Sequence, residues 1–166
     1  MIWESELFQL ANILNLNHVP EQFVEDYLGG KATTLFLGAA AGSEKFYVNV
    51  DKISPGSKSA KYHAHSKQEE FFLILSGNGT LRMNGQEYPV KKGDFVAKPA
   101  GRDIAHPFIN TGTEVLEILD VGTKEDGDIA YYPDEEVILL RDQRKAFKLA
   151  DAMPDWDSEP NKEDSR

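Results

Sequence analysis

The 166 residues of the chain suit one compact domain, and a hydrophobic content of 40 % is enough to form a core. The 18 basic and 28 acidic residues give a formal net charge of −10. That charge repels phosphate backbones and anionic lipid headgroups, so we expect neither a nucleic-acid partner nor a membrane partner. The absence of cysteine excludes disulfide scaffolds, thiolate metal sites and cysteine nucleophiles.

Signals for export or membrane insertion are missing from the sequence. The apolar runs are too short to cross a bilayer. Residues 1–6 lack the basic and apolar regions of a signal peptide. We therefore expect a cytoplasmic protein.

Two segments near the N-terminus have helical patterns. Residues 5–16 carry leucines at helical spacing, but Asn12, Asn15 and Asn17 are poor helix formers, so either a helix or an extended segment fits. Residues 20–28 predict a helix, because Pro20 suits a first turn and Phe23 and Tyr27 would share one face. A double glycine follows and would end this helix.

Short runs of β-forming residues, separated by Gly, Pro and Asn turn signals, fill the middle of the chain. The predicted strands are Phe46–Ile53, Phe71–Leu75, Thr80–Met83, Asp94–Ala97, Val115–Val121 and Val137–Leu140. Asn84-Gly85 is typical of a type I′ turn, so Thr80–Met83 and Gln86–Val90 are predicted to form one hairpin. This spacing indicates an all-β sandwich or barrel.

The histidines suggest a metal site. His63 and His65 are two residues apart, and in a strand such residues point to the same side. Glu70 opens an apolar strand, where a carboxylate is costly unless a cation compensates it. Two imidazoles and a carboxylate are a coordination set for Fe(II), Mn or Zn, and His106 would add a fourth ligand from a separate strand.

Two spaced motifs carry a resemblance to a known family. They read Gly56-x6-His63-x-His65-x4-Glu70-x6-Gly77 and Gly93-x5-Pro99-x-Gly101-x4-His106-x3-Asn110. In order and spacing they resemble the two cupin motifs, over about residues 45–122. The segments before His63 and His106 are one and two residues longer than the usual motifs.

The resemblance implies an all-β fold, a cupin double-stranded β-helix or jelly-roll barrel at residues 46–150, with short peripheral helices. It implies that the barrel holds one divalent transition metal, Fe, Mn, Zn or Ni. It carries the ligand role onto His63, His65, Glu70 and His106. Residues 106–112 and 131–134 are similar to the corresponding segments of small stand-alone bacterial cupins with no assigned reaction. The resemblance implies that the chain binds a small-molecule ligand or substrate.

Three functions remain open at this point. A metal-dependent enzyme of the dioxygenase, isomerase or lyase type is the first, and a non-catalytic module that binds or senses a small molecule is the second. A structural or storage protein without a metal is the third. No catalytic residue is assigned, because no Lys or Arg is evident on the inward side, and only one of Glu117 and Asp120 can face inward.

Several other residues receive structural interpretations. Strand alternation places Phe72 and Ile74 on the side of Glu70, and Phe108 on the side of His106, as an apolar pocket wall. We expect surface roles for His18, Glu69 and the basic stretch 141–148, and a turn-stabilising role for Asn110.

The chain ends complete the predicted organisation. Residues 1–45 are expected to pack on the barrel or on a partner subunit, and residues 151–166 to form an acidic peripheral tail. Because an antiparallel sheet needs covered edges, we expect a homodimer.

Overall fold

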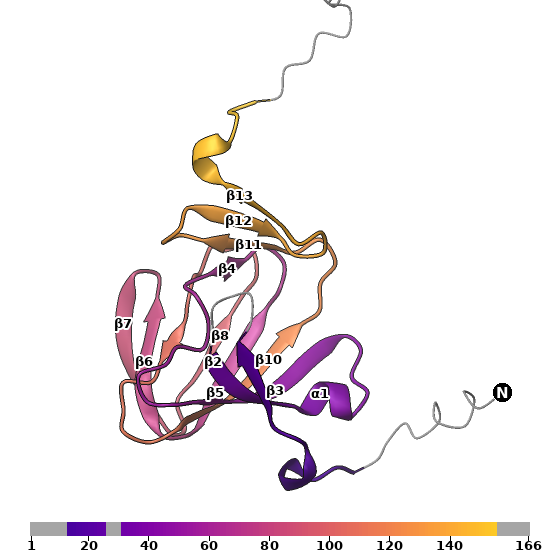
Figure 1. The fold of residues 1–166 in the computed structure, drawn as a ribbon, viewed down its shortest axis with the longest axis vertical. Coiled ribbons are helices and arrows are strands. Elements are labelled where there is room, and N and C mark those ends of the chain that lie inside the picture. The colour runs from indigo at the N-terminus through magenta and orange to yellow at the C-terminus, as the bar shows by residue number, and fades with distance from the viewer. Residues whose placement is uncertain (1–12, 26–30, 156–166) are drawn as a thin grey trace, which may run out of the picture.

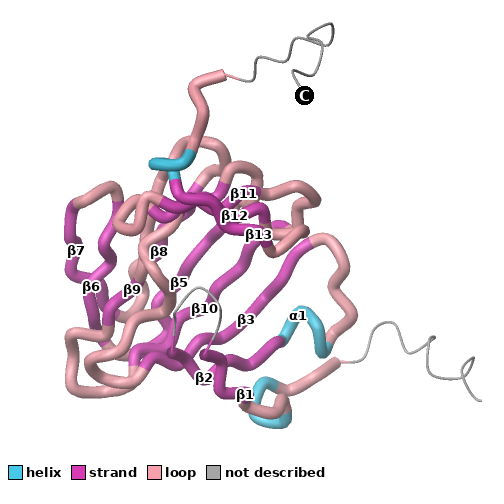
Figure 2. Tube along the Cα trace, turned by 45° about the horizontal axis from the view of Figure 1, so that its top comes forward, coloured by secondary structure: helices cyan, strands magenta, loops and turns pink. Residues whose placement is uncertain are grey.

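The structure is a computed structural model that describes residues 13–25 and 31–155. Their strands form three antiparallel sheets (Figures 1 and 2). The six-stranded sheet has the order β1 (Gln22–Glu25), β2 (Lys31–Phe36), β3 (Phe46–Ile53), β10 (Leu116–Thr123), β5 (Glu70–Ser76) and β8 (Phe95–Lys98). The four-stranded sheet has the order β13 (Lys145–Lys148), β12 (Val137–Leu140), β11 (Ile129–Tyr132) and β4 (Ala64–His65). The three-stranded sheet has the order β7 (Gln86–Lys91), β6 (Asn78–Met83) and β9 (Phe108–Ile109).

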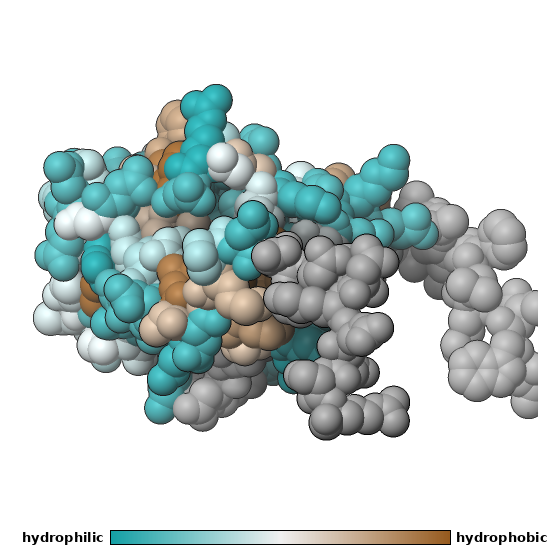
Figure 3. Space-filling view, turned by 90° about the horizontal axis from the view of Figure 1, so that it is seen from above, coloured by the Kyte–Doolittle hydropathy of each residue, from teal (hydrophilic) through white to brown (hydrophobic). Residues whose placement is uncertain are grey.

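Helical structure in the described residues is short and peripheral. It consists of α1 (Leu37–Ala40) and two 3-10 turns, Leu16–His18 and Leu149–Asp151. None of these helices is long and apolar enough to span a membrane. On the face that Figure 3 shows, hydrophobic residues form small areas among hydrophilic ones.

The predicted strands of the middle of the chain are confirmed, with ends that differ by a few residues. The hairpin of β6 and β7 turns at Asn84 and Gly85, whose φ angles of 50° and 76° are those of the predicted turn. Gly77 also has a positive φ of 76°, and a Cβ there would lie 2.5 Å from the backbone oxygen of Val115. Only glycine therefore fits at this close approach.

The helix predicted at residues 20–28 is wrong where the structure describes it. Gln22–Glu25 is a strand that pairs antiparallel with β2 over four residues, and residues 26–30 lie outside the described part. An isolated helix of this length has little stability of its own, whereas the sheet edge offers backbone partners to an apolar stretch. Most of the segment 5–16 also lies outside the described residues.

The chain before residue 46 contributes to the main sheet. β2 pairs with β3 from Thr33 to Phe36, and β1 extends the sheet beyond it. At the other end of the chain, residues 151–155 are exposed. The remaining residues of the predicted acidic tail lie outside the described part.

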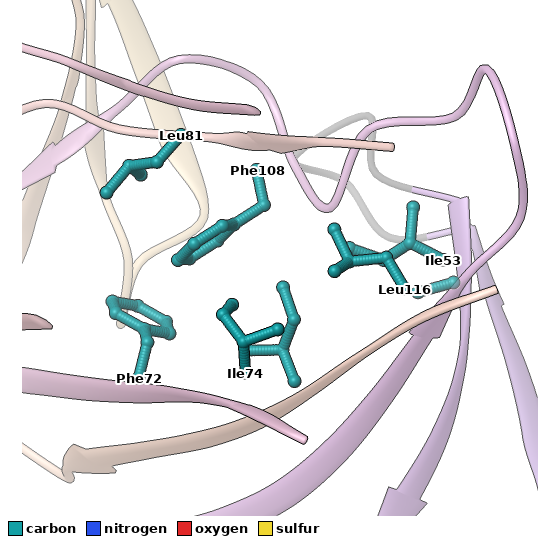
Figure 4. Close-up of a cluster of buried hydrophobic side chains, with 8 residues drawn as sticks. Ile53, Phe72, Ile74, Leu81, Phe108 and Leu116 are labelled. Carbon is teal, nitrogen blue, oxygen red and sulfur yellow. The ribbon is translucent and has the colours of Figure 1, made fainter. Parts of the chain in front are cut away.

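An apolar core fills one end of the interior between the sheets. Figure 4 shows its side chains pointing toward one another from β3, β5, β6, β9 and β10. The buried members are Ala32, Ile53, Phe72, Ile74, Leu81, Phe108, Leu116 and Ile118. Burial of this apolar area is the main favourable contribution to folding.

Strand β5 connects the apolar end of the interior to a polar one. Its residues 70, 72 and 74 are buried while Phe71 is exposed, as strict alternation requires. Phe72 and Ile74 join the core, and Glu70 lies among buried polar residues. The predicted common side of Glu70, Phe72 and Ile74 is therefore confirmed.

Asn110 has the predicted structural role at the turn after β9. Its amide donates to the backbone oxygens of Ile53 and Glu114, at 2.6 and 2.8 Å, and its Oδ1 accepts from the Gly112 N–H. The residue is 1 % exposed, so water cannot replace these bonds.

We expect Asn110→Ala to lower the free energy of unfolding by about 2–4 kcal/mol, because it leaves buried carbonyl oxygens without donors. Chemical denaturation followed by circular dichroism measures this loss. Asn17→Ala is the control, since Asn17 is exposed and its replacement should change stability by less than about 0.5 kcal/mol. Equal effects of the two variants would contradict this role of Asn110.

Candidate metal centre

The polar end of the interior brings together histidines from two distant segments. His63 and His106 are backbone partners, joined by two hydrogen bonds between their N–H and C=O groups. Directly paired residues of an antiparallel bridge point to the same side, and the two imidazole centroids lie 5.1 Å apart. His65 is in β4, and Glu70 begins β5. All four residues are buried.

His63 and His65 converge through their Nε2 atoms, which lie 3.1 Å apart. The Nδ1 of His63 lies 2.7 Å from the backbone oxygen of Lys61, and the Nδ1 of His65 lies 2.6 Å from a carboxylate oxygen of Asp128. Both partners only accept hydrogen bonds, so both Nδ1 atoms carry the proton. The Nε2 atoms of the two rings therefore face each other, and each carries a lone pair when its ring is neutral.

Glu70 supplies a carboxylate beside this pair. Its Oε1 lies 3.6 Å from the Nε2 of His65, and it also accepts hydrogen bonds from Gln68 and Tyr47, at 2.9 and 3.1 Å. Burial alone would raise the pKa of Glu70, but the adjacent imidazoles and the Lys98 ammonium lower it below its usual range. Glu70 is therefore an anion.

The three residues fit a divalent cation. Among the described residues, the ligand atoms of His63, His65 and Glu70 all lie within 4.8 Å of one another. Nitrogens bound to one metal at about 2.0–2.1 Å lie about 3.0–3.4 Å from each other. The Nε2 separation of 3.1 Å falls in that range, and a cation between them removes the repulsion of the two lone pairs.

His106, the fourth predicted ligand, has a different environment. Its Nδ1 lies 3.0 Å from the Nζ of Lys98, and Lys98 also forms an ion pair with the Oε2 of Glu70. Burial, and next the charge of Lys98, hold the pKa of His106 well below its usual value, so the ring is neutral. Metal ligation by His106 stays a prediction.

Lys98 corrects the expectation that no basic side chain lies on the inward side. It is 2 % exposed, and it ends β8 directly opposite Glu70. Burial lowers its pKa, while Glu70 favours the ammonium. Alternation along β8 from Val96 could have placed Lys98 inward.

Asp128 contacts the Nδ1 of His65, on the side of the ring away from His63. The sequence did not predict this residue as part of the site. Besides His65, it accepts hydrogen bonds from the backbone N–H of Lys67 at 2.8 Å and from Arg141 at 3.0 Å. Burial opposes the ionisation of Asp128, but these bonds lower its pKa below the usual range. Arg141, expected on a solvated face, instead donates to Asp128 and to Gln68 at 2.5 Å. The exposed Lys145 and Lys148 agree with the prediction.

A cavity of about 250 Å³ opens beside the three histidines. Phe72 and Phe108 form part of its wall, as predicted. The opposite wall carries polar residues of β2, β3 and β10, namely Thr34, Tyr47, Asn49, Asp51 and Asp120. Carboxylate, hydroxyl and imidazole groups thus surround a space the size of a small metabolite.

The structure shows which of Glu117 and Asp120 faces the interior. Asp120 lines the cavity, whereas Glu117 accepts a hydrogen bond from Ser76 and lies 3.8 Å from the ammonium of Lys52. Burial, and next the charges of Asp51 and Glu70, raise the pKa of Asp120 well above its usual value. Tyr47 connects Asp120 to Glu70, with its hydroxyl 3.0 and 3.1 Å from their oxygens. Burial therefore favours the protonated form of Asp120 at the cavity wall.

The residues expected on the surface lie there. His18 and Glu69 are exposed, and the structure places neither at the cavity. Tyr132 is buried, and its ring stacks on that of His63 at a centroid distance of 5.9 Å. It thus covers one face of the His63 imidazole.

Comparisons with known proteins point to one family. A family model described as a cupin domain matches residues 49–122. Over 70 residues the chain is 39 % identical to an oxalate-binding protein from Thermotoga maritima, a match that covers 42 % of this chain and 55 % of that protein. The chain thus spans about half the length of this curated relative.

Two solved structures are similar over nearly their whole length. One is described as a proposed sugar phosphate isomerase from Acidithiobacillus ferrooxidans, with 30 % identity and a TM-score of 0.81, covering 87 % of this chain and 97 % of that chain. The other is a sugar phosphate isomerase of a cupin superfamily from Silicibacter pomeroyi, with 28 % identity and a TM-score of 0.76, covering 85 % of this chain and 95 % of that chain.

The metal-free protein should lose stability as the pH falls from about 6.5 to about 4. Burial, and next the charges of His65 and Lys98, lower the pKa of His63 to about 4. Between these pH values the unfolded chain binds a proton at His63 that the folded chain does not, so acid favours unfolding by about 3 kcal/mol at most.

Denaturant titrations of the chelated protein at several pH values measure this slope. His63→Gln should flatten it, and His18→Gln, at an exposed position, should leave it unchanged. An unchanged slope in His63→Gln would show that His63 is not the group responsible. Glu70 and Asp128, whose pKa values are lowered, lose their contribution only at more acidic pH.

Proposed function

The chain belongs to the cupin superfamily, and from this premise we propose that it is a metal-dependent isomerase acting on a small hydroxylated carbonyl compound. His63, His65 and Glu70 would hold one divalent transition metal. The substrate would occupy the adjacent cavity.

One observation carries the metal part of the proposal. The Nε2 atoms of His63 and His65 face each other at 3.1 Å although both rings hold their protons on Nδ1. When both rings are neutral, their lone pairs repel each other at this distance, and a cation bound between them removes that repulsion. The ionised Glu70 beside them supplies the negative charge that a divalent cation requires.

The bound metal would act as a Lewis acid that polarises a carbonyl oxygen. The protein's own residues would handle the protons and the hydroxyl groups. Burial favours the protonated form of Asp120 at the cavity wall, and Tyr47 joins Asp120 to Glu70 by hydrogen bonds. Such a protonated carboxyl can exchange a proton with a substrate oxygen, which is one of the two transfers in an isomerisation between adjacent carbonyl and hydroxyl carbons. The other transfer moves a hydrogen between the two carbons, and no residue is assigned to it.

The polar wall favours a polyhydroxylated substrate over a dicarboxylate. Asp51 and Asp120 present carboxyl groups, and Thr34 and Asn49 add neutral polar groups. Substrate hydroxyls can donate to these acceptors, whereas a carboxylate substrate would meet negative charge. Two similar structures are described as sugar phosphate isomerases, and the sugar part of such a substrate has the hydroxyl groups that this wall can accept.

A second candidate function is non-catalytic binding of a small carboxylate. The 39 % identity to an oxalate-binding protein over 70 residues favours it. Oxalate could occupy open positions of the metal without using Asp120. Calorimetric titration of the metal-loaded protein with oxalate tests this alternative, and tight binding without any turnover would favour it over the isomerase.

We expect about one transition metal ion for each chain purified without a histidine tag. His65→Gln should weaken metal binding more than about 100-fold, and Asp128→Asn by about 10–100-fold, because Asp128 orients the ring of His65. Competition with a chromophoric chelator measures both affinities. His18→Gln is the control, and a wild-type chain that binds no transition metal would refute the proposal.

The metal-loaded protein should interconvert small aldoses and ketoses, detected by proton NMR of the substrate and product. Asp120→Asn should lower kcat about 100-fold or more with its metal content unchanged, because an amide cannot transfer the proton. Glu117→Gln, on the same strand and outside the cavity, is the matched control. Equal activity of Asp120→Asn and the wild type would exclude Asp120 as the proton carrier.

The homodimer, the cytoplasmic location and the packing role of residues 1–45 stay predictions. Light scattering at micromolar concentration tests the first. A dimer would cover the sheet edge at β1 or β8, which are the outer strands of the six-stranded sheet.

A further inference from the structure

Lys98 is the hydrogen-bond partner of the His106 imidazole. It lies in the interior at the end of β8, with Glu70 as its cross-strand partner. Its ammonium pairs with the Oε2 of Glu70 and lies 3.0 Å from the Nδ1 of His106. Both contacts are buried, because the three side chains are at most 6 % exposed.

The hydrogen-bond capacity of these groups fixes the tautomer of His106. The ion pair with Glu70 favours the ammonium form of Lys98, which has three donors and no acceptor, so the Nδ1 of His106 accepts from it. A neutral imidazole carries one proton, which is then on Nε2. His63 and His65 are in the opposite tautomer, because their Nδ1 atoms face a backbone oxygen and a carboxylate.

We propose that His106 is a hydrogen-bond donor to the bound ligand and not a metal ligand, and that Lys98 is the residue that positions it for this role. A ring nitrogen that bears a proton has no lone pair for a metal. His106 lines the cavity, so its Nε2–H is available to an oxygen atom held there. The inference rests on the proposed function for the identity of that ligand.

The metal would then have two histidines and one carboxylate as its protein ligands. These are the three residues whose ligand atoms lie within 4.8 Å of one another. Such a set leaves more positions open than a set of three histidines and one carboxylate. A substrate could therefore bind through two adjacent oxygens, while His106 donates to one of them.

The tautomer of His106 can be measured directly in the metal-free, full-length chain. Long-range proton–nitrogen NMR of ¹⁵N-histidine-labelled protein distinguishes Nδ1–H from Nε2–H rings. We expect Nε2–H for His106 and Nδ1–H for His63 and His65. An Nδ1–H ring at His106 in the wild type would overturn the proposal, and this measurement needs no variant.

Lys98→Met provides a second test. It removes the donor with little change in volume, and the nearest carboxylate oxygen to Nδ1 is then Oε2 of Glu70, 4.0 Å away in the wild type. His106 should change to the Nδ1–H tautomer. An unchanged tautomer in a folded Lys98→Met protein would show that Lys98 does not position His106.

Metal affinity separates this inference from the proposed function. His106→Gln should weaken Zn²⁺ or Co²⁺ binding by no more than about 10-fold, against more than about 100-fold for His65→Gln. Equal losses in the two variants would make His106 a ligand and refute the inference. A wild-type chain that binds no metal would refute the proposed function, while the NMR tautomer would still decide whether His106 presents a donor.

Discussion

The chemistry of the interior depends on the group that each imidazole Nδ1 faces. A carbonyl oxygen holds the proton on Nδ1 of His63, and Asp128 does the same for His65. Both rings therefore turn their Nε2 atoms toward the same point, and these atoms lie 3.1 Å apart. At His106 the neighbour is the Lys98 ammonium, a donor, and the ring is reversed. We propose that three similar side chains thus acquire two different functions from their hydrogen-bond partners.

The two ends of the interior depend on each other through strand β5. Alternation along this strand places Glu70 at the polar end and Ile74 in the apolar core, with Phe72 between them. The ring of Phe72 contacts both His106 and Phe108, at centroid distances of 4.9 and 5.1 Å. The core therefore fixes the positions of the groups that form the site. It also keeps water away from the ion pair of Glu70 and Lys98, where a missing partner would be costly.

The sequence predicted a strand or turn correctly where residue types within that segment were sufficient to specify it. The strand Phe46–Ile53 and the turn at Asn84 and Gly85 follow from β propensity and from the backbone freedom of those two residues. The helix expected at residues 20–28 failed because its apolar spacing also fits a short strand. Residues 22–25 form a strand because β2 offers them an edge with unpaired backbone groups. Residues 20–28 alone contain no information about that edge.

The sequence by itself determined that His63 and His65 lie on one side of a strand, and that Glu70 opens a buried strand near them. Those relations depend only on a period of two residues. Only the tertiary structure decided that Lys98 faces Glu70 and His106, and that Asp128 lies behind His65. The hydrogen-bond partners of buried groups come from strands that are distant in the chain. Their choice depends on the register of strand pairing, which no spacing within one segment encodes.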